Sequence, residues 1–462
     1  MCSEVAGYGC VMLGSVLVKN GLVVTPLGVF KWDVRVVDGV IVEIGSGLQA
    51  TGVEEVIDAS GHYVFPGVVD EHVHMREPGL EYKDDFEHGS RAAIKGGVTT
   101  VIEHPNTIPP IDEPSRILQK AKLLEQKAYA DFALLGVLHD ANVHLFEEML
   151  STGATGFKVF MGPTTGNIPP PSDSTLCEIM SMSAKTGTRV LFHAEDYGII
   201  SYFTSKLKAT GREDPLVHEE ARPPLAEVYG IAKIAVIAKY TGGFAHILHV
   251  SSKDALKAIN EAKQIGVNIT AETCPHYLVL DRDDYYKYGS LIKVNPPIRG
   301  GIHRKALLEA VSRGEIEVVG SDHAPHAPEE KLKAIWEAAA GLAGVQTLFP
   351  LMLDLALRGV LPITVLPRVL SENPAKMFNL WPWKGSLLPG SSGDLVLVDP
   401  RGGTEVTVNW LEYKHKLSPY VGWRLKGRIV HVILRGNTVV REGEFTGKRV
   451  GRWIRRRSGG SA

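Results

Sequence analysis

The sequence predicts an α/β protein in which a (β/α)8 TIM-like barrel carries a small discontinuous β-sandwich domain built from both chain ends. Two observations predict this fold. Short apolar runs alternate with amphipathic helical stretches across residues 66–384, which is typical of a parallel sheet. Short β runs broken by turn residues fill 1–65 and 385–462 instead. We therefore expect these two end segments to form the N-terminal and C-terminal parts of the small domain.

The end segments contain several predicted strands. Those near the N-terminus are SVLVKNGLVV, DVRVVDGVIVEIG and HYVFPG, and those near the C-terminus are GDLVLVDP, EVTVNW and RIVHVILRGNTVV. Asn20-Gly21 and Asp38-Gly39 are predicted hairpin turns, because these residue types tolerate the positive φ angles that tight hairpins need.

Eight apolar runs are the predicted barrel strands. They are GVVDEHV from Gly67, VTTVIE from Val98, FALLGVL from Phe132, TGFKVFM from Thr155, RVLFHAE from Arg189, AHILHVS from Ala245, VNITAET from Val267 and EVVGSDH from Glu317. Helical stretches between them include SRILQKAKLLEQKA from Ser115, PLAEVYGIAKIAVIAKY from Pro224 and KDALKAINEAKQIG from Lys253. Eight strands that alternate with helices predict a closed barrel.

Composition excludes several classes of protein. The 462 residues carry 50 Lys and Arg against 52 Asp and Glu, so no bulk charge attracts nucleic acid or an anionic membrane. The apolar run Val11 to Val18 is too short to span a bilayer. Four cysteines without a CxxC pair argue against a disulfide scaffold. We expect a cytoplasmic protein, with a basic end at 447–462 that is either solvated or a docking tail.

Metal-binding residue types stand at the ends of the predicted strands. In a parallel barrel, functional side chains gather at these carboxyl ends. The residues concerned are His72, His74, Lys158, His193, His249 and Asp322. His72 and His74 are two apart on a strand, so both imidazoles point to one side and can share an ion. Together the six residues predict a metal centre.

Lys158 is unusual in such a set, because an ammonium group repels cations. A lysine that is desolvated at a barrel mouth loses its proton readily, and the neutral amine can take up carbon dioxide to form a carbamate. The carbamate is an anion with two oxygens, suited to bridging two metal ions.

Seven strings, taken in order, resemble the cyclic amidohydrolases of the dihydroorotase, allantoinase and hydantoinase type. They are PGVVDEHVHMREPGLEYKDD, GFKVFM, FHAED, HVSS, AETCPHYL, VNPPIR and SDHAPHAPEEK. The resemblance extends over nearly the whole chain. It implies that His72, His74 and Asp322 hold one Zn²⁺, that His193 and His249 hold the other, and that N6-carboxylated Lys158 bridges them.

This site predicts ring hydrolysis. Two divalent ions make hydroxide available at neutral pH and polarise a ring carbonyl. Asp322 would be the catalytic residue, accepting the hydroxide proton and delivering it to the departing ring nitrogen.

Five further residues are expected to bind the substrate. Arg76, Asn106 and His326 match the positions that resemble the carboxylate clamp of dihydroorotases, and Asn295 falls on another of their substrate positions. Gly341 would add backbone contacts. A bidentate guanidinium suits a buried carboxylate, so a small-molecule substrate with a carboxylate is expected.

Each clamp residue also has a simpler explanation. Arg76 would form an ion pair with an acidic neighbour such as Glu77, Asn106 would form a turn, and His326 would pack on Pro328. Thr164 and Thr165 in GPTTGN suit a lid over the ring, or an ordinary surface loop.

One departure from the dihydroorotase pattern is the string EHPN. It puts Glu103 and His104 at the mouth of the second barrel strand, where either would add an unexpected charge near the substrate.

These observations favour a dihydroorotase that reversibly cyclises N-carbamoyl-L-aspartate to L-dihydroorotate in pyrimidine biosynthesis. An allantoinase or a hydantoinase is the alternative, because GFKVFM and ETCPHYL resemble those enzymes equally well. A third hypothesis is a non-catalytic scaffold, disfavoured because all six ligands are present. We expect a homo-oligomer, and docking with another pyrimidine-pathway enzyme through the basic end stays open beside a solvated end. The sequence leaves open which divalent metal is bound.

Overall fold

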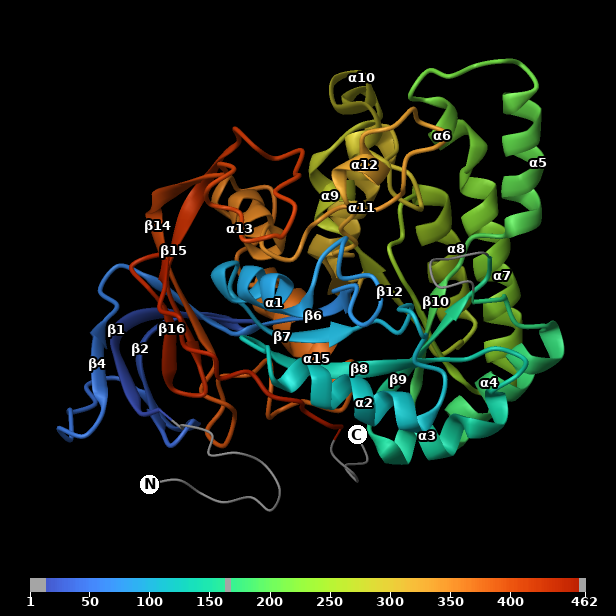
Figure 1. Cartoon of the computed structure of the whole chain (residues 1–462). Helices are drawn as coiled ribbons and strands as arrows, with labels where there is room; N and C mark the ends of the chain where they lie inside the picture. Colours follow the sequence, from blue (N-terminus) through green and yellow to red (C-terminus); the bar gives the residue numbers. More distant parts are fainter. Residues whose placement is uncertain (1–13, 163–167, 457–462) are drawn as a thin grey trace.

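The computed structural model describes residues 14–162 and 168–456 (Figure 1). Eight parallel strands form its barrel: β6 (Val68–Val73), β7 (Val98–Glu103), β8 (Asp131–Val137), β9 (Ala154–Phe160), β10 (Arg189–His193), β11 (Phe244–Ile247), β12 (Ile269–Thr273) and β13 (Val318–Val319). They pair in sequence order from β6 to β13. A parallel bridge between Val73 and His323 brings the end of the last strand beside the first. The predicted (β/α)8 barrel is confirmed.

Helices connect and surround these strands. They are α1 (Phe86–Lys95), α2 (Pro114–Glu125), α3 (Phe146–Thr152), α4 (Asp173–Thr186), α5 (Tyr197–Lys208), α6 (Val217–Ala221), α7 (Pro224–Thr241), α8 (Lys253–Gln264), α9 (Pro275–Val279), α10 (Tyr285–Tyr288), α11 (Gly301–Arg313), α12 (Pro328–Lys331), α13 (Leu348–Leu357), α14 (Val365–Pro367) and α15 (Asn373–Met377). Shorter helical turns are η1 (Val143–Leu145), η2 (Arg282–Asp284), η3 (Gly289–Ile292) and η4 (Arg368–Glu372).

Helix α8 illustrates why these segments are helical. The Ser252 side chain accepts a hydrogen bond from Ala255 N and caps the helix. Ala255, Leu256 and Ile259 are buried on one face of the helix. This spacing places the apolar side chains against the barrel, as the sequence pattern predicts.

The small domain joins both chain ends in one sheet. Its strands are β1 (Val16–Thr25), β2 (Gly28–Val37), β3 (Val40–Gly45), β4 (Glu55–Asp58), β5 (Tyr63–Pro66), β14 (Leu395–Glu405), β15 (Arg424–Leu434), β16 (Asn437–Arg441) and β17 (Glu444–Phe445). The antiparallel pair β5–β14 links the two ends, and β4 and β5 pair with β1 in parallel. The domain is therefore discontinuous, as predicted, and lies beside the barrel (Figure 1).

Two local predictions for this domain are wrong. Asn20, with φ 60°, lies at a register shift inside β1 and not in a hairpin turn, and its amide donates to Asp33 Oδ1 at 2.6 Å. The string EVTVNW leaves the sheet after Glu405 and turns, with Trp410 N donating to Thr407 O. The hairpin turn at Asp38-Gly39 is confirmed, because it connects β2 to β3 with positive φ at both residues.

The basic C-terminal segment packs against the barrel as far as Arg456. Phe132 at the start of β8 pairs with Trp453, and Ile454 is 7% exposed. The Arg456 guanidinium donates to Thr188 Oγ1 at 2.7 Å. This part of the segment is therefore anchored on the barrel, while Lys448, Arg449 and Arg455 remain exposed.

No helix in the described ranges is long and apolar enough to cross a membrane.

Candidate metal centre

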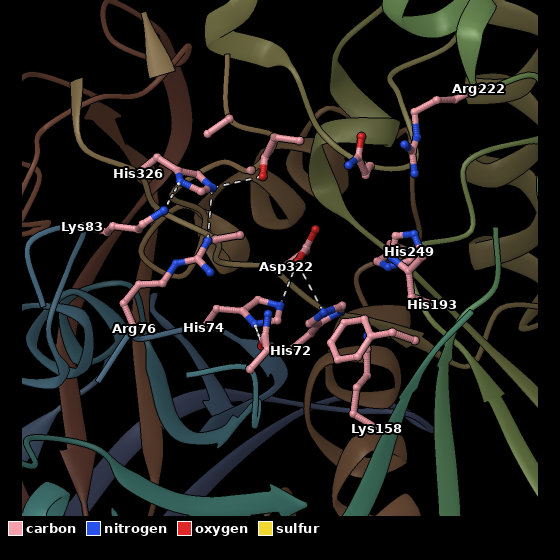
Figure 2. Close-up of a pocket in the computed structure, with 17 residues that line it drawn as sticks. His72, His74, Arg76, Lys83, Lys158, His193, Arg222, His249, Asp322 and His326 are labelled. Carbon is pink, nitrogen blue, oxygen red and sulfur yellow. Dashed lines mark hydrogen bonds and ion pairs between the residues drawn. The ribbon is translucent and has the colours of Figure 1, made fainter. Parts of the chain in front are cut away.

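One cavity of about 450 Å³ opens at the carboxyl ends of the barrel strands (Figure 2). It is lined by every residue that the sequence analysis proposed as a metal ligand or a substrate contact. These are His72, His74, Arg76, Asn106, Lys158, His193, His249, Asn295, Asp322, His326 and Gly341. The fold therefore brings the two proposed sets together. Thr164 and Thr165, proposed as part of a lid, lie outside the described residues.

His72, His74 and Asp322 form one half of the centre. The Asp322 Oδ1 atom lies 3.3 Å from His72 Nε2 and 3.4 Å from His74 Nε2. The other ring nitrogen of each imidazole is already held, since His72 Nδ1 donates to Glu272 at 2.9 Å and His74 Nδ1 donates to Asn106 Oδ1 at 2.6 Å. Both Nε2 lone pairs are left facing the same carboxylate, which is the arrangement that metal-ligating histidines adopt.

His193 and His249 form the other half. Their ring centroids are 4.6 Å apart in an edge-to-face arrangement. His193 Nε2 donates to Glu195 Oε2 at 2.8 Å, which leaves Nδ1 available as a ligand. His249 Nδ1 is buried without a hydrogen-bond partner among the described residues. An orphaned ring nitrogen of this kind is costly unless a ligand satisfies it.

Lys158 projects from β9 between the two halves. Its side chain is 1% exposed, and its Nζ lies 5.0 Å from the centroid of the Phe160 ring. Within the described residues it forms no side-chain hydrogen bond. Burial lowers the pKa of Lys158 to about 8. The neutral amine is therefore accessible near neutral pH, which fits the carbamate chemistry expected for it.

The charge state of the imidazoles also suits a metal. Burial lowers the pKa of His72 and His249 well below its usual value, and that of His74 to about 4. All three rings are neutral at pH 7, and only a neutral imidazole has a lone pair to give. Neutral imidazoles of this kind could therefore bind divalent ions.

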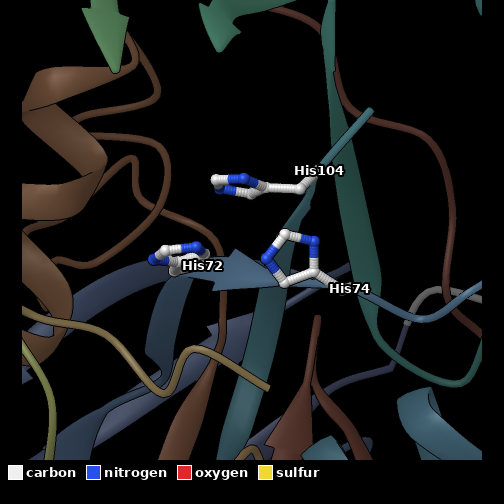
Figure 3. A group of neighbouring side chains, drawn as sticks. All are labelled: His72, His74 and His104. Carbon is white, nitrogen blue, oxygen red and sulfur yellow. The ribbon is translucent and has the colours of Figure 1, made fainter. Parts of the chain in front are cut away.

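His104 joins His72 and His74 in a cluster of three imidazoles (Figure 3). Its ring stacks on His72 at 4.2 Å with an interplanar angle of 14°. Because lone pairs lie in the ring planes, two stacked rings cannot direct them at one ion. His104 Nε2 instead donates to Glu71 O at 3.2 Å. His104 thus packs on the face of the His72 ring and is not among the residues that line the cavity.

Glu103 likewise puts no free charge near the substrate. Its carboxylate accepts a hydrogen bond from Lys120 Nζ on α2 at 3.0 Å and another from Met75 N at 3.0 Å. The expectation that Glu103 or His104 charges the cavity mouth is wrong, because one is paired behind the strand and the other is a neutral buried ring.

Arg76, Lys83 and His326 form a basic wall of the cavity (Figure 2). The Arg76 Nε donates to Pro325 O at 3.0 Å, and Lys83 Nζ lies 3.3 Å from His326 Nδ1. Lys83 also pairs with Glu330 at 2.9 Å. Arg76, at 2% exposed, has no carboxylate in ion-pair contact among the described residues. Its guanidinium is a buried cation that lines the cavity, and the acidic groups around it, of which Asp322 acts most strongly, do not touch it.

The ion-pair explanation for Arg76 is thereby wrong, because Glu77 pairs with Lys127 instead.

Three other residues predicted to bind the substrate differ in the groups that they present to the cavity. Asn106 has its Oδ1 committed to His74, so it orients a ligand. Asn295 Oδ1 is buried without a partner among the described residues and faces the cavity. Gly341, with φ 149°, has no room for a side chain, because a Cβ there would lie 2.3 Å from Ala324 O.

Several residues of this site were not predicted from the sequence. Glu195 and Glu272 each stand at or just beyond a strand end, so the strand-end signal could have found them. Lys83 and Arg222 come from loops between elements, and their position in the cavity depends on the fold.

Several known proteins resemble this chain over most of its length. A model of the amidohydrolase family matches residues 63–439. An allantoinase of Deinococcus radiodurans is 35% identical over 450 residues, which are 96% of this chain and 99% of that protein. An L-hydantoinase of Paenarthrobacter aurescens is 35% identical, over 93% of this chain and 95% of that protein.

Among solved structures, the L-hydantoinase (dihydropyrimidinase) from Arthrobacter aurescens superimposes with a TM-score of 0.93 at 34% identity. The match covers 96% of this chain and all of that one. A dihydropyrimidinase from Brevibacillus agri gives a TM-score of 0.90 at 30% identity, over 97% of this chain and 100% of that one.

These relatives correct the assignment made from the sequence. The expectation of a dihydroorotase in pyrimidine biosynthesis is wrong, because proteins similar over almost the full length are named allantoinase and hydantoinase. That expectation rested on the proposed metal ligands together with Arg76, Asn106 and His326 as a carboxylate clamp. They identify the group and do not distinguish its substrates.

Proposed function

The chain belongs to the amidohydrolase family, and on that premise we propose that it is a metal-dependent hydrolase that opens a cyclic amide ring of the hydantoin or allantoin type. The observation that carries the proposal is the convergence of four imidazoles, Lys158 and Asp322 on one cavity at the mouth of a parallel barrel. The names of the relatives support the choice of ring.

The proposed centre holds two divalent ions. His72, His74 and Asp322 would bind one ion, His193 and His249 would bind the other, and carboxylated Lys158 would bridge them. Bound divalent ions would lower the pKa of a water molecule and polarise the ring carbonyl. Imidazole and carboxylate ligands suit zinc.

Ring opening adds water across the amide C–N bond. The water oxygen joins the carbonyl carbon, and the ring nitrogen departs with a proton. We assign both proton transfers to Asp322, which accepts the proton from water and returns it to the nitrogen. The position of its Oδ1 between two imidazoles supports this assignment.

We further propose that the substrate ring carries an anionic substituent. The support is Arg76, whose buried guanidinium lines the cavity and has no carboxylate in ion-pair contact within the described structure. A buried unpaired cation is strongly destabilising unless its ligand supplies the opposite charge. His326, held by Ala340 O at 3.1 Å, fixes the wall beside it.

The test is a ring-opening assay of zinc-loaded protein on hydantoin, allantoin and 5-carboxymethylhydantoin. We expect hydrolysis that a chelator abolishes and zinc restores. Arg76→Met should lower kcat/KM for the carboxylated ring about 10- to 100-fold, the equivalent of one charge-assisted hydrogen bond. The control Arg313→Met, on an exposed surface, should leave the rates unchanged.

Absence of ring opening by the zinc-loaded wild type would overturn the proposed hydrolase. Equal losses on charged and neutral rings in Arg76→Met would overturn the anionic substituent alone.

A further inference from the structure

Arg222, another cationic residue at the cavity, pairs with a carboxylate that the ring-opening chemistry does not use. Arg222 lies at the end of α6, just before α7, and its side chain reaches down to the His193 side of the cavity (Figure 2). We propose that Arg222 is a positioning residue that, through Glu195, holds His193 in the orientation needed to bind metal. This inference rests on the proposed function, because it concerns one half of the same centre.

The contacts form an unbroken chain from Arg222 to His193. Arg222 Nε donates to Glu195 Oε1 at 3.0 Å, and Arg222 Nη2 donates to Glu195 Oε2. The same Oε2 accepts a hydrogen bond from His193 Nε2 at 2.8 Å. A bidentate guanidinium fixes both oxygens of a carboxylate, so it fixes the direction in which that carboxylate accepts.

The buried charge of Glu195 depends on its pairing with Arg222. Its side chain is 1% exposed, and a buried carboxylate without a compensating cation is strongly disfavoured. Both of its oxygens face donors, because the Arg222 guanidinium spans the carboxylate and His193 Nε2 meets Oε2. The group therefore remains a carboxylate and acts only as an acceptor.

The orientation of His193 follows from that acceptor. Because Glu195 can only accept, His193 Nε2 carries the proton and Nδ1 keeps the lone pair. The Nδ1 atom is then the one available to a metal. If Arg222 were removed, Glu195 would lose its bidentate anchor and the His193 ring would lose its fixed rotation.

The half of the centre that contains His72 and His74 does not depend on Arg222. His72 is anchored by Glu272, and His74 is anchored by Asn106. Neither anchor contacts Arg222 among the described residues. Loss of Arg222 should therefore weaken one metal position and spare the other, which general destabilisation of the fold would not do.

The experiment measures zinc bound per chain by plasma mass spectrometry, after equilibrium dialysis over a series of free zinc concentrations. We expect wild type to bind two equivalents. In Arg222→Met, affinity for one equivalent should fall about 10- to 100-fold, while the other keeps its wild-type affinity. Arg222→Lys retains the charge without the bidentate geometry, so its loss should be smaller.

Arg212→Met is the matched control. Arg212 lies nearby in sequence and pairs with Asp214 and Glu220, which are partly exposed and outside the cavity lining, so both equivalents should bind normally. If Arg222→Met does not fold, Glu195→Gln tests the same link, because it keeps the side-chain volume and removes the charged acceptor.

Two results would overturn the inference. One is wild-type affinity for both equivalents in the soluble variant, and the other is equal weakening of both. In either case a zinc-binding, ring-opening wild type would leave the proposed function standing. A wild type that binds no zinc would instead overturn both.

Discussion

At the scale of single residues, three that line the cavity have left-handed backbone conformations. They are Arg76, His249 and Asp322, with φ angles of 65°, 42° and 44°. Such angles are uncommon outside glycine, and they persist only where the surroundings hold them. His249 N, for example, donates to Glu272 Oε2 at 3.2 Å. These residues come just after their strands, at positions where the backbone bends. Their side chains line the cavity at the bends.

Asn106 gives a prediction at this scale. Its Oδ1 anchors His74 at 2.6 Å, so Asn106→Ala should lower zinc affinity about 10- to 100-fold, because the His74 ring loses its orientation. Competition with a chromophoric chelator measures this affinity. Asn268→Ala, which removes an exposed side chain, should have no effect. A raised KM at unchanged zinc affinity would instead make Asn106 the direct substrate contact that the sequence suggested.

The residues that could be predicted are those whose signal is local. His72, His74 and Asp322 stand at strand ends, and the strand itself is visible in a few neighbouring residues. The ion pair that compensates the charge of Glu103 could not be predicted, because its partner Lys120 lies on the helix after the strand. The role of Arg222 could not be predicted for the same reason, because its partner Glu195 belongs to a different segment of the chain.

At the scale of elements, the last barrel strand is much shorter than the sequence pattern predicts. The apolar run from Glu317 predicts seven residues, but only Val318–Val319 pair as β13. Gly320 follows, and a Cβ there would lie 2.0 Å from Glu272 Oε1. The strand therefore ends where Glu272 must pass to reach His72. Apolar patterning predicts which segments form strands, whereas their ends depend on the side chains of neighbouring strands.

The C-terminal segment gives a prediction at this scale. Ile454 packs in an apolar cluster with Phe378 and Leu380 at the end of the barrel opposite the cavity. Ile454→Ala should lower the free energy of unfolding by about 2 to 4 kcal/mol, through lost burial and the space left behind. Denaturant unfolding measures the change. Ile302→Ala, at a residue 65% exposed, should change stability by less than about 0.5 kcal/mol. Equal stability of the two variants would mean that the segment is not part of the folded core.

At the scale of the whole molecule, a buried group of charges joins three parts of the chain. Lys384 donates to Asp131 on β8 at 2.6 Å and to Asp394 at 2.6 Å. Arg435 on the small domain pairs with the same Asp131. The Arg452 amide from the C-terminal segment also donates to Asp131 Oδ1 at 3.0 Å. These partners are far apart in sequence, so no local pattern could have predicted them.

This group makes stability depend on pH. Burial tends to raise the pKa of Asp131, but Arg435 and Lys384 outweigh it and lower that pKa to about 2, from 3.8 for an unperturbed group. A carboxyl group with a lowered folded-state pKa contributes its stability above the unfolded pKa and loses it as pH falls through the folded value. We therefore expect Asp131 to contribute roughly 2 kcal/mol at neutral pH, lost between about pH 4 and pH 2.

Lys384→Met tests the coupling between the barrel and the small domain. Removing one cation leaves Asp131 and Asp394 buried with less compensation, so the free energy of unfolding at pH 7 should fall by about 3 to 5 kcal/mol. Because the pKa of Asp131 would rise toward its unfolded value, the loss of stability below pH 4 should also be smaller than in wild type. Lys185→Met, at an exposed ion pair with Glu147, should cost less than about 1 kcal/mol and keep the acid dependence. If Lys384→Met matched that control at pH 7, the buried charges would contribute no net stability, and apolar packing alone would hold the two domains together.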